Sequence, residues 1–141
     1  MTSTVDIAPS LLDELRSFRL AKRSSKGAAL VAKIDKTKLF IEKEEILDPI
    51  TPEELEEELP EHSPRFVVFS TELRHADGRV SYPLVLIHWA PVSASMELST
   101  LYASALSMFS VHANVGKVID VREGGLTMPM LAERLGAGVP R

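Results

Sequence analysis

With 141 residues, the chain is long enough for a single domain that buries one sizeable core. It contains no cysteine, which excludes disulfides and cysteine-based metal sites. The net charge of −4 is unevenly distributed: residues 1–40 carry eight Lys or Arg and four acidic residues, whereas residues 41–62 carry ten acidic residues and one lysine. No continuous basic stripe could follow a phosphate backbone, so nucleic acid is not an expected ligand. The basic segment 1–40 and the acidic segment 41–62 instead favour an oriented encounter with another protein.

The N-terminal third predicts a helix and a hairpin. Pro9 is typical of the first turn of a helix, and the apolar spacing that follows it continues to about residue 21. Strands are expected at 28–34 and 38–43, on either side of a short polar turn. The segment before this helix lacks the basic start and apolar run of a secretory signal, so we expect a cytosolic protein.

A second helix is predicted from its N-terminal signals. Thr51 is its N-cap, Pro52 its first residue and Glu54 completes a capping box, and the helix ends before Pro60. Leucines at positions 55 and 59 are expected to contact the core. The glutamates are predicted to form a solvated face: Glu53, Glu54, Glu56, Glu57 and Glu58.

Strands follow at 65–74 and 79–90, joined by the hairpin turn signal Asp77-Gly78. Pro83 lies inside the second of them and indicates an edge position or a bulge. A further strand is expected at 117–122, after a long helix capped by Ser95. This helix is long enough for a parallel crossover between the strands on either side of it.

The last predicted element is a short helix with Thr127 as its cap and Gly136 as its end, followed by a loose tail at 137–141. The complete order is therefore α-β-β-α-β-β-α-β-α. It predicts one α/β domain whose mixed, mostly antiparallel sheet is covered by helices on both faces.

Nineteen consecutive residues of the long helix and its end, 98–116, carry no acidic or basic side chain. At helical spacing one face is apolar and is expected to meet the core: Leu98, Leu101, Tyr102, Ala105, Phe109 and His112. The other face is small and neutral, where a solvated helix would carry Lys and Glu: Thr100, Ala103, Ser104, Ser107, Ser110 and Val111. Two interpretations remain open, a helix buried on both sides and a helix that docks on a partner. The polar residues in the run argue against a membrane span.

Motifs for chemistry are missing. The four histidines fall in different predicted elements without metal-ligand spacing, so no metal or cofactor is expected. Gly124-Gly125 before a helix is interpreted as a flexible turn rather than an anion site. The glutamates of the second helix offer an acid and a base, but they crowd one exposed helix, so an enzyme is the weaker hypothesis.

Several segments, in this order and spacing, resemble the actin-depolymerising-factor homology (cofilin-like) fold, and within it the glia maturation factor subfamily. The resemblance covers roughly residues 5–136. Its most specific segment is Asp77-Gly78-Arg79-Val80-Ser81-Tyr82-Pro83-Leu84. The others are Leu15-Arg16-Ser17-Phe18-Arg19, Lys33-Ile34-Asp35-Lys36, Glu58-Leu59-Pro60-Glu61, Pro64-Arg65-Phe66-Val67-Val68-Phe69-Ser70 and Leu101-Tyr102-Ala103-Ser104.

The resemblance implies a central mixed sheet of five to six strands between helices. It also implies a monomeric, non-enzymatic regulator of the actin cytoskeleton at cortical structures. Such proteins bind the actin-related protein 2/3 complex, inhibit nucleation of branched filaments and promote dissociation of branches. Contact with the first actin subunit of a branch is left open, and neither nucleic acid nor membrane is an expected partner.

Three groups of residues are implied as contact surfaces. The first is the long helix with the turn after the last strand: Met96, Thr100, Ala103, Ser104, Ser107, Val111, Gly124, Gly125 and Leu126. The second is the basic end of the first helix: Arg16, Arg19, Lys22 and Arg23. The third is the hairpin tip, implied in debranching, where His75 and Arg79 are expected to be free for contact: His75, Asp77 and Arg79.

One departure from the family pattern concerns charge. Relatives place lysines in the long helix just after the Tyr-Ala segment, where this chain has Leu106, Ser107 and Met108. A cofilin-type protein that binds actin monomers or filaments is the main alternative, and this departure weakens it. A small adaptor of membrane traffic is a third reading, because such domains also combine a mixed sheet with helices.

Overall fold

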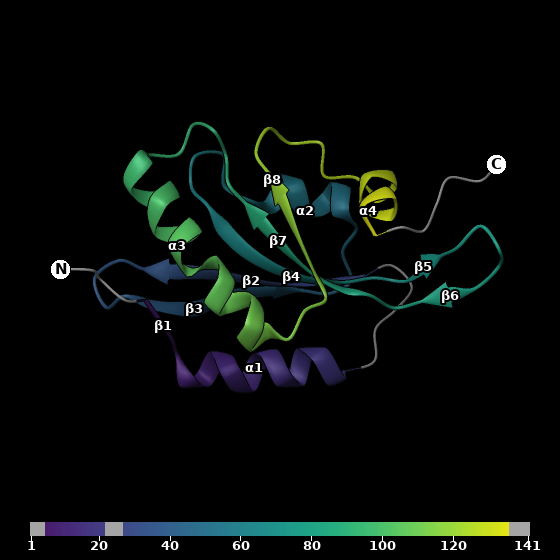
Figure 1. Cartoon of the computed structure of the whole chain (residues 1–141), viewed down its shortest axis with the longest axis horizontal. Coiled ribbons are helices and arrows are strands. Elements are labelled where there is room, and N and C mark those ends of the chain that lie inside the picture. The colour runs from purple at the N-terminus through teal and green to yellow at the C-terminus, as the bar shows by residue number, and fades with distance from the viewer. Residues whose placement is uncertain (1–4, 22–26, 136–141) are drawn as a thin grey trace.

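The computed structural model describes residues 5–21 and 27–135, and a six-stranded mixed sheet forms its centre (Figure 1). The strand order is β1-β3-β2-β4-β7-β8. The four inner strands are antiparallel neighbours: β3 (Phe40–Leu47), β2 (Ala28–Asp35), β4 (Arg65–Ser70) and β7 (Leu84–Trp89). Both edge strands pair in parallel, β1 (Asp6–Ile7) with β3 and β8 (Lys117–Val121) with β7. The expected mixed α/β sheet is confirmed.

Helices cover both faces of this sheet. Helices α1 (Pro9–Leu20) and α3 (Met96–Ala113) pack on one face, and α2 (Pro52–Glu58) and α4 (Met128–Arg134) pack on the other. Residues of β2 alternate between the two cores: Leu30 joins the α1–α3 core, whereas Ala29 and Val31 join the α2–α4 core. Because β2 is central and buried on both faces, its sequence is almost entirely apolar.

The predicted helix starts are confirmed by their capping geometry. Thr51 and Glu54 form the reciprocal capping box of α2. The hydroxyl of Ser95 accepts from the backbone N–H of Leu98, and that of Thr127 accepts from Met130. Each cap satisfies a donor that would otherwise have no partner in the first helical turn. The predicted end of the last helix at Gly136 and the tail 137–141 lie outside the described residues.

Two predicted strands are shorter and divided. The strand expected at 65–74 ends at Ser70, and β5 (Leu73–Arg74) pairs instead with β6 (Val80–Ser81) in a separate two-stranded hairpin. The strand expected at 79–90 is interrupted before β7. Pro83 lies in this interruption. It has no N–H to donate to a strand ladder, which explains why the strand breaks there.

Two other differences lie at the sheet edge next to α1. The two-residue β1 pairs through Asp6 and Ile7 with Phe40 and Ile41, and its sequence is too short to show a strand period. The second strand of the first hairpin runs at 40–47 rather than 38–43. Leu39 has φ of 58°, so the turn takes up residues that the sequence pattern assigned to the strand.

Candidate functional site

Helix α3 is anchored to the sheet by aromatic side chains. Tyr102, Ala105, Phe109 and Ala113 are buried, and the ring of Phe66 from β4 stacks on Phe109 with centroids 4.9 Å apart. The ring of Tyr102 lies 5.2 Å from that of Phe66. Aromatic pairs at such distances add to the stabilisation from burial alone. The helix is therefore held rigidly, with one face turned to the core.

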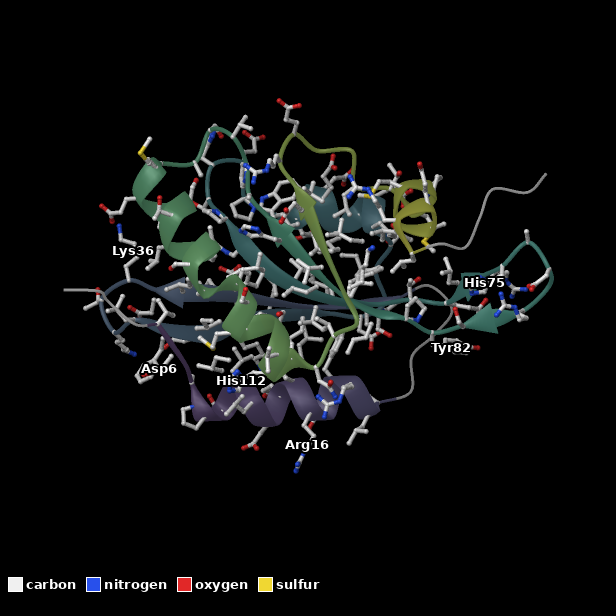
Figure 2. All side chains as sticks on the ribbon, in the orientation of Figure 1. Asp6, Arg16, Lys36, His75, Tyr82 and His112 are labelled. Atoms are coloured by element: carbon white, nitrogen blue, oxygen red, sulfur yellow. The ribbon has the colours of Figure 1, made fainter. Side chains whose placement is uncertain are left out.

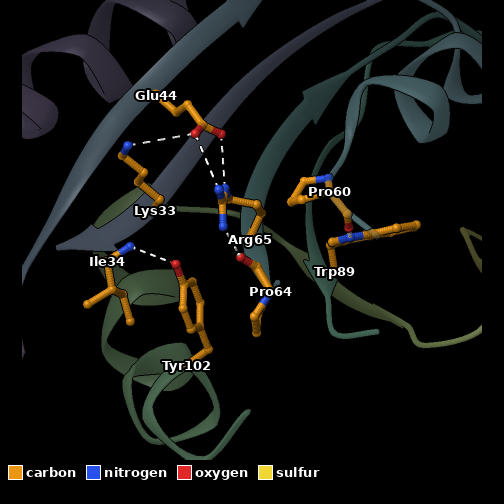
Figure 3. Close-up of polar contacts among 8 residues, drawn as sticks. All are labelled: Lys33, Ile34, Glu44, Pro60, Pro64, Arg65, Trp89 and Tyr102. Carbon is orange, nitrogen blue, oxygen red and sulfur yellow. Dashed lines mark hydrogen bonds and ion pairs between the residues drawn. The ribbon is translucent and has the colours of Figure 1, made fainter. Parts of the chain in front are cut away.

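The hydroxyl of Tyr102 accepts a hydrogen bond of 2.9 Å from the backbone N–H of Ile34 on β2 (Figure 3). Burial raises the pKa of Tyr102 above its ordinary value. Beside it, the guanidinium of Arg65 donates to both carboxylate oxygens of Glu44 at 2.9 and 3.3 Å, and Lys33 lies 3.8 Å from the same carboxylate. These contacts join β2, β3 and β4 under α3.

The opposite face of α3 is exposed along its length. All six predicted docking residues lie on it, with Met96 84% and Val111 74% exposed and the smaller residues between them: Met96, Thr100, Ala103, Ser104, Ser107 and Val111. We call these six residues the docking face. The alternative of a helix buried on both sides is therefore wrong for this chain. The prediction for His112 is also wrong, because it is exposed and its Nδ1 lies 2.9 Å from the carbonyl oxygen of Met108.

The docking face is neutral because α3 has a single formally charged residue, Glu97. Glu97 pairs with Lys36 from the β2–β3 turn at 2.9 Å, and this hydrogen bond lowers the pKa of the carboxyl group. Leu106 and Met108, which depart from the lysines that the family resemblance led us to expect, are partly buried and pack against the core. A shallow, mainly apolar hollow of about 640 Å³ lies beside the N-terminal half of the face, lined by Lys36, Leu39, Met96, Thr100 and Ser104 among others.

The turn before α4 is held by glutamates of α2. The Glu56 carboxylate accepts from the backbone N–H of Leu126 at 2.7 Å, and Glu53 accepts from Met128 at 3.0 Å. The prediction of a solvated face is therefore wrong for Glu56, which is half-buried, whereas Glu53 is exposed as predicted. Gly124 and Gly125 have φ of 85° and 79°, a conformation that favours glycine. Leu126 is only 1% exposed, which corrects the prediction that its side chain contacts a partner, because it belongs to the α2–α4 core.

The other two predicted surfaces lie apart from the docking face. Arg16 is exposed on the side of α1 away from the sheet, and Arg19 is half-buried (Figure 2). Lys22 and Arg23 lie outside the described residues. Figure 2 places His75 in the β5–β6 hairpin, at the opposite end of the sheet from the N-terminus of α3.

The side chains of the hairpin tip form hydrogen bonds within the hairpin. Asp77 accepts from the backbone N–H of Arg79 at 3.1 Å and from its guanidinium at 2.7 Å, and both bonds lower the pKa of Asp77. Arg79 keeps 73% of its side chain exposed. His75 differs from the expectation of a free residue, because its Nε2 lies 2.8 Å from the hydroxyl of Ser81. The tip thus presents the ion pair of Arg79 with Asp77, whose side chain is 57% exposed.

Similarity to known proteins agrees with this architecture. The family described as "Cofilin/tropomyosin-type actin-binding protein" matches residues 4–124. Human glia maturation factor beta is 42% identical over 132 residues, which cover 93% of this chain and 92% of that protein. The solution structure of glia maturation factor from Caenorhabditis elegans has a TM-score of 0.80 and 33% identity, covering 95% of this chain and 99% of the other. The chain belongs to the glia maturation factor family.

Membership of the glia maturation factor family confirms the resemblance found in the sequence. The Drosophila melanogaster glia maturation factor is 36% identical over 118 residues, which cover 84% of this chain and 85% of that protein. Streptomyces griseoflavus cofilin, at 21% identity and a TM-score of 0.72 over 84% of this chain and 86% of the other, shares the fold. The reading as a membrane-traffic adaptor receives no support from these relatives.

Within the parts of the chain that the structure describes, no helix is long and apolar enough to span a membrane. In the same residues, no group of three or more His, Asp or Glu side chains is placed to hold a metal ion.

The sequence patterns do not predict the roles of two side chains. The sequence predicts a solvated face for Glu56, yet its carboxylate holds a turn 70 residues away in the sequence. The sequence shows His88 only as one of four histidines in different elements, yet it is buried at 4% exposure and forms part of a pocket wall beside α3. Its place in the otherwise apolar run of β7 was the available signal, because a strand covered on both faces buries successive side chains, and residues 85–89 are all buried.

Proposed function

We propose that this protein regulates branched actin networks by binding the actin-related protein 2/3 complex. In this proposal it inhibits nucleation of branched filaments and promotes dissociation of existing branches, without covalent chemistry. The observation that carries the proposal is the exposed, neutral face of α3 in a chain of the glia maturation factor family. The description of the matching family as actin-binding supports an actin-related partner.

The docking face suits insertion of a helix into an apolar groove of an actin-like subunit. Met96 and Val111 are large exposed apolar side chains at its two ends, about 22 Å apart at the rise of an α-helix. Thr100, Ala103 and Ser107 between them are small and let the helix backbone approach closely. This is the helix-in-groove mode, in which apolar anchors on one helical face carry recognition.

Two further segments extend the proposed contact. Arg122 lines both the pocket beside Thr100 and Ala103 and the pocket that includes Gly124 and Gly125. The glycine turn thus continues the surface beyond the docking face. We propose that Arg16 and Arg19, with Lys22 and Arg23, meet acidic groups of the partner. The protein would act as a monomer in the cytoplasm, at cortical actin structures.

The proposal is tested by adding the purified protein to preformed filament branches under fluorescence microscopy. We expect branches to dissociate faster than in buffer and fewer new branches to form when the protein is present from the start. Unchanged branch lifetimes together with unchanged nucleation would contradict the proposed function. The family description also fits the alternative of a cofilin-type protein that binds actin filaments. Cosedimentation with bare filaments distinguishes the two functions, and we expect the protein to stay in the supernatant.

The hairpin tip should separate branch removal from binding. Replacing both His75 and Arg79 with alanine removes the exposed guanidinium and the Ser81 contact while leaving the docking face untouched. We expect the rate of branch dissociation to fall several-fold while affinity for the purified complex changes less than about twofold, since rim side chains contribute little to affinity. Equal losses in both assays would show that the two surfaces are one.

Binding through the docking face should depend weakly on ionic strength. Glu97, the one formal charge of α3, is already paired with Lys36. In a variant whose four basic residues Arg16, Arg19, Lys22 and Arg23 are replaced by alanine, we expect the dissociation constant to change less than about threefold between 50 and 200 mM salt, because screening acts on charges and hardly on apolar contact. A tenfold or larger change in this variant would show that the contact through α3 itself depends on charge.

A further inference from the structure

One buried polar group of the described residues lacks a hydrogen-bond partner. This group is Nε2 of His88 on β7, a residue that is 4% exposed. Among the described residues, no other buried side-chain nitrogen or oxygen lacks a partner. Burying such a group without a partner destabilises the fold, so it calls for an explanation. The side chain lies on the α3 side of the sheet, with its ring centroid 5.8 Å from that of Phe66.

The other ring nitrogen determines what Nε2 can do. The Nδ1 atom lies 3.0 Å from Oδ1 of Asp120, which stands opposite His88 in the parallel β7–β8 pair. An ionised carboxylate only accepts hydrogen bonds, so this contact places the hydrogen of the neutral imidazole on Nδ1. The unpaired Nε2 is then an acceptor with a free lone pair, and Asp120 fixes its direction.

The residue His88 lies beside the docking face. His88 contributes to the wall of an open pocket of about 390 Å³ between α3 and the ends of β7 and β8. Thr100 and Ala103 of the docking face line the same pocket, and Val92 and Arg122 line its other side. Val92 is 68% exposed, so an apolar residue borders the pocket where a partner of α3 would approach.

We propose that this pocket receives a neutral hydrogen-bond donor from the docked partner, a side-chain hydroxyl or carboxamide, which donates to Nε2 of His88. The inference rests on the proposed function, since the same partner supplies the group. Arg122 in the wall disfavours a lysine or arginine there, and the lone pair of Nε2 with Asp120 behind it disfavours a carboxylate. Because Nε2 is covered in the free chain, docking must shift side chains at the pocket wall to reach it.

The test is His88→Phe, with binding to the purified actin-related protein 2/3 complex as the measurement. Phenylalanine keeps an aromatic ring beside Phe66 and removes the unpaired acceptor, and Asp120 keeps access to solvent with 51% of its side chain exposed. We expect the variant to melt at the same or a higher temperature than the parent and to bind at least tenfold more weakly. A purely structural histidine would show the opposite pattern, a lower melting temperature with binding unchanged per folded molecule.

His112→Phe is the matched control, because it makes the same change at an exposed histidine of α3 outside the docking face. Its affinity should stay within twofold of the parent. If the parent binds and His88→Phe binds with the same affinity, the pocket assignment is overturned while the proposed function stands. No binding by the parent would overturn the proposed function and this inference with it.

Discussion

Replacing Ser104 with glutamate should abolish binding to the actin-related protein 2/3 complex while the protein stays folded. Ser104 is exposed in the middle of the docking face, and its hydroxyl donates only to the carbonyl oxygen of Leu101 in its own helix. In an apolar groove the new carboxylate would lose its water without gaining a cation, which costs several kcal/mol. We expect affinity to fall at least about 100-fold, equivalent to about 2.7 kcal/mol. A pull-down with titrated complex measures this.

The fold should tolerate this change. A surface substitution away from caps and core alters the free energy of unfolding by about 0.5 kcal/mol or less. Ser10→Glu is the matched control, since Ser10 is an exposed residue of the first turn of α1, where an acidic side chain suits the helix dipole. It should bind like the parent.

Ser107→Arg tests the same face with the opposite charge, one turn further along α3. If both variants lose binding, the cause is the desolvation of a charge in the contact and not the sign of that charge. If Ser104→Glu or Ser107→Arg bound as tightly as Ser10→Glu, the docking face would not be the contact surface.

Replacing Phe109 with alanine should lower the free energy of unfolding by about 3–5 kcal/mol, the range for large-to-small changes in a well-packed core. Phe109 is fully buried and stacks on Phe66 at 4.9 Å, so the substitution removes an aromatic pair and leaves a cavity under α3. Because a domain of this size is typically stable by about 5–15 kcal/mol, this loss is a large share of the total. Urea unfolding followed by circular dichroism measures it.

The size of the side chain, rather than its ring alone, should set this loss. Phe109→Leu leaves most of the volume in place, and we expect it to cost about 1–2 kcal/mol. If Phe109→Ala unfolded within about 1 kcal/mol of the parent, the α1–α3 core would not depend on this contact. Binding by the folded fraction of either variant should be unchanged, because Phe109 faces away from the docking face.

The two kinds of variant separate the roles of α3. Its inner face is held by Tyr102 and Phe109, whereas its outer face carries the proposed contact and adds little to stability. The inner face therefore serves stability and the outer face serves binding. Thr100 and Ala103 of the outer face also line the pocket that contains His88.

Local sequence signals predicted much of this fold correctly. Ser95, Thr51 and Thr127 mark three of the helix starts that the structure confirms, because a cap is decided by a hydroxyl and a backbone N–H three residues apart. Helical period separated Tyr102 and Phe109 from Ser104 and Ser107, because the angle between side chains on one helix depends on that helix alone. The parallel crossover through α3 followed from the element order.

The sequence by itself therefore determined the helices α1 to α4, the mixed sheet and the neutral outer face of α3, and its family resemblance suggested what that face does. Only the tertiary structure decided that this face is exposed and that His112 shares the solvent side. It also decided that Glu56 holds the turn at Leu126 and that His88 is paired with Asp120 on one side and unpaired on the other. Periodicity and caps act within a few residues, whereas these contacts join residues 32 to 70 positions apart, where no local pattern in one chain specifies the partner.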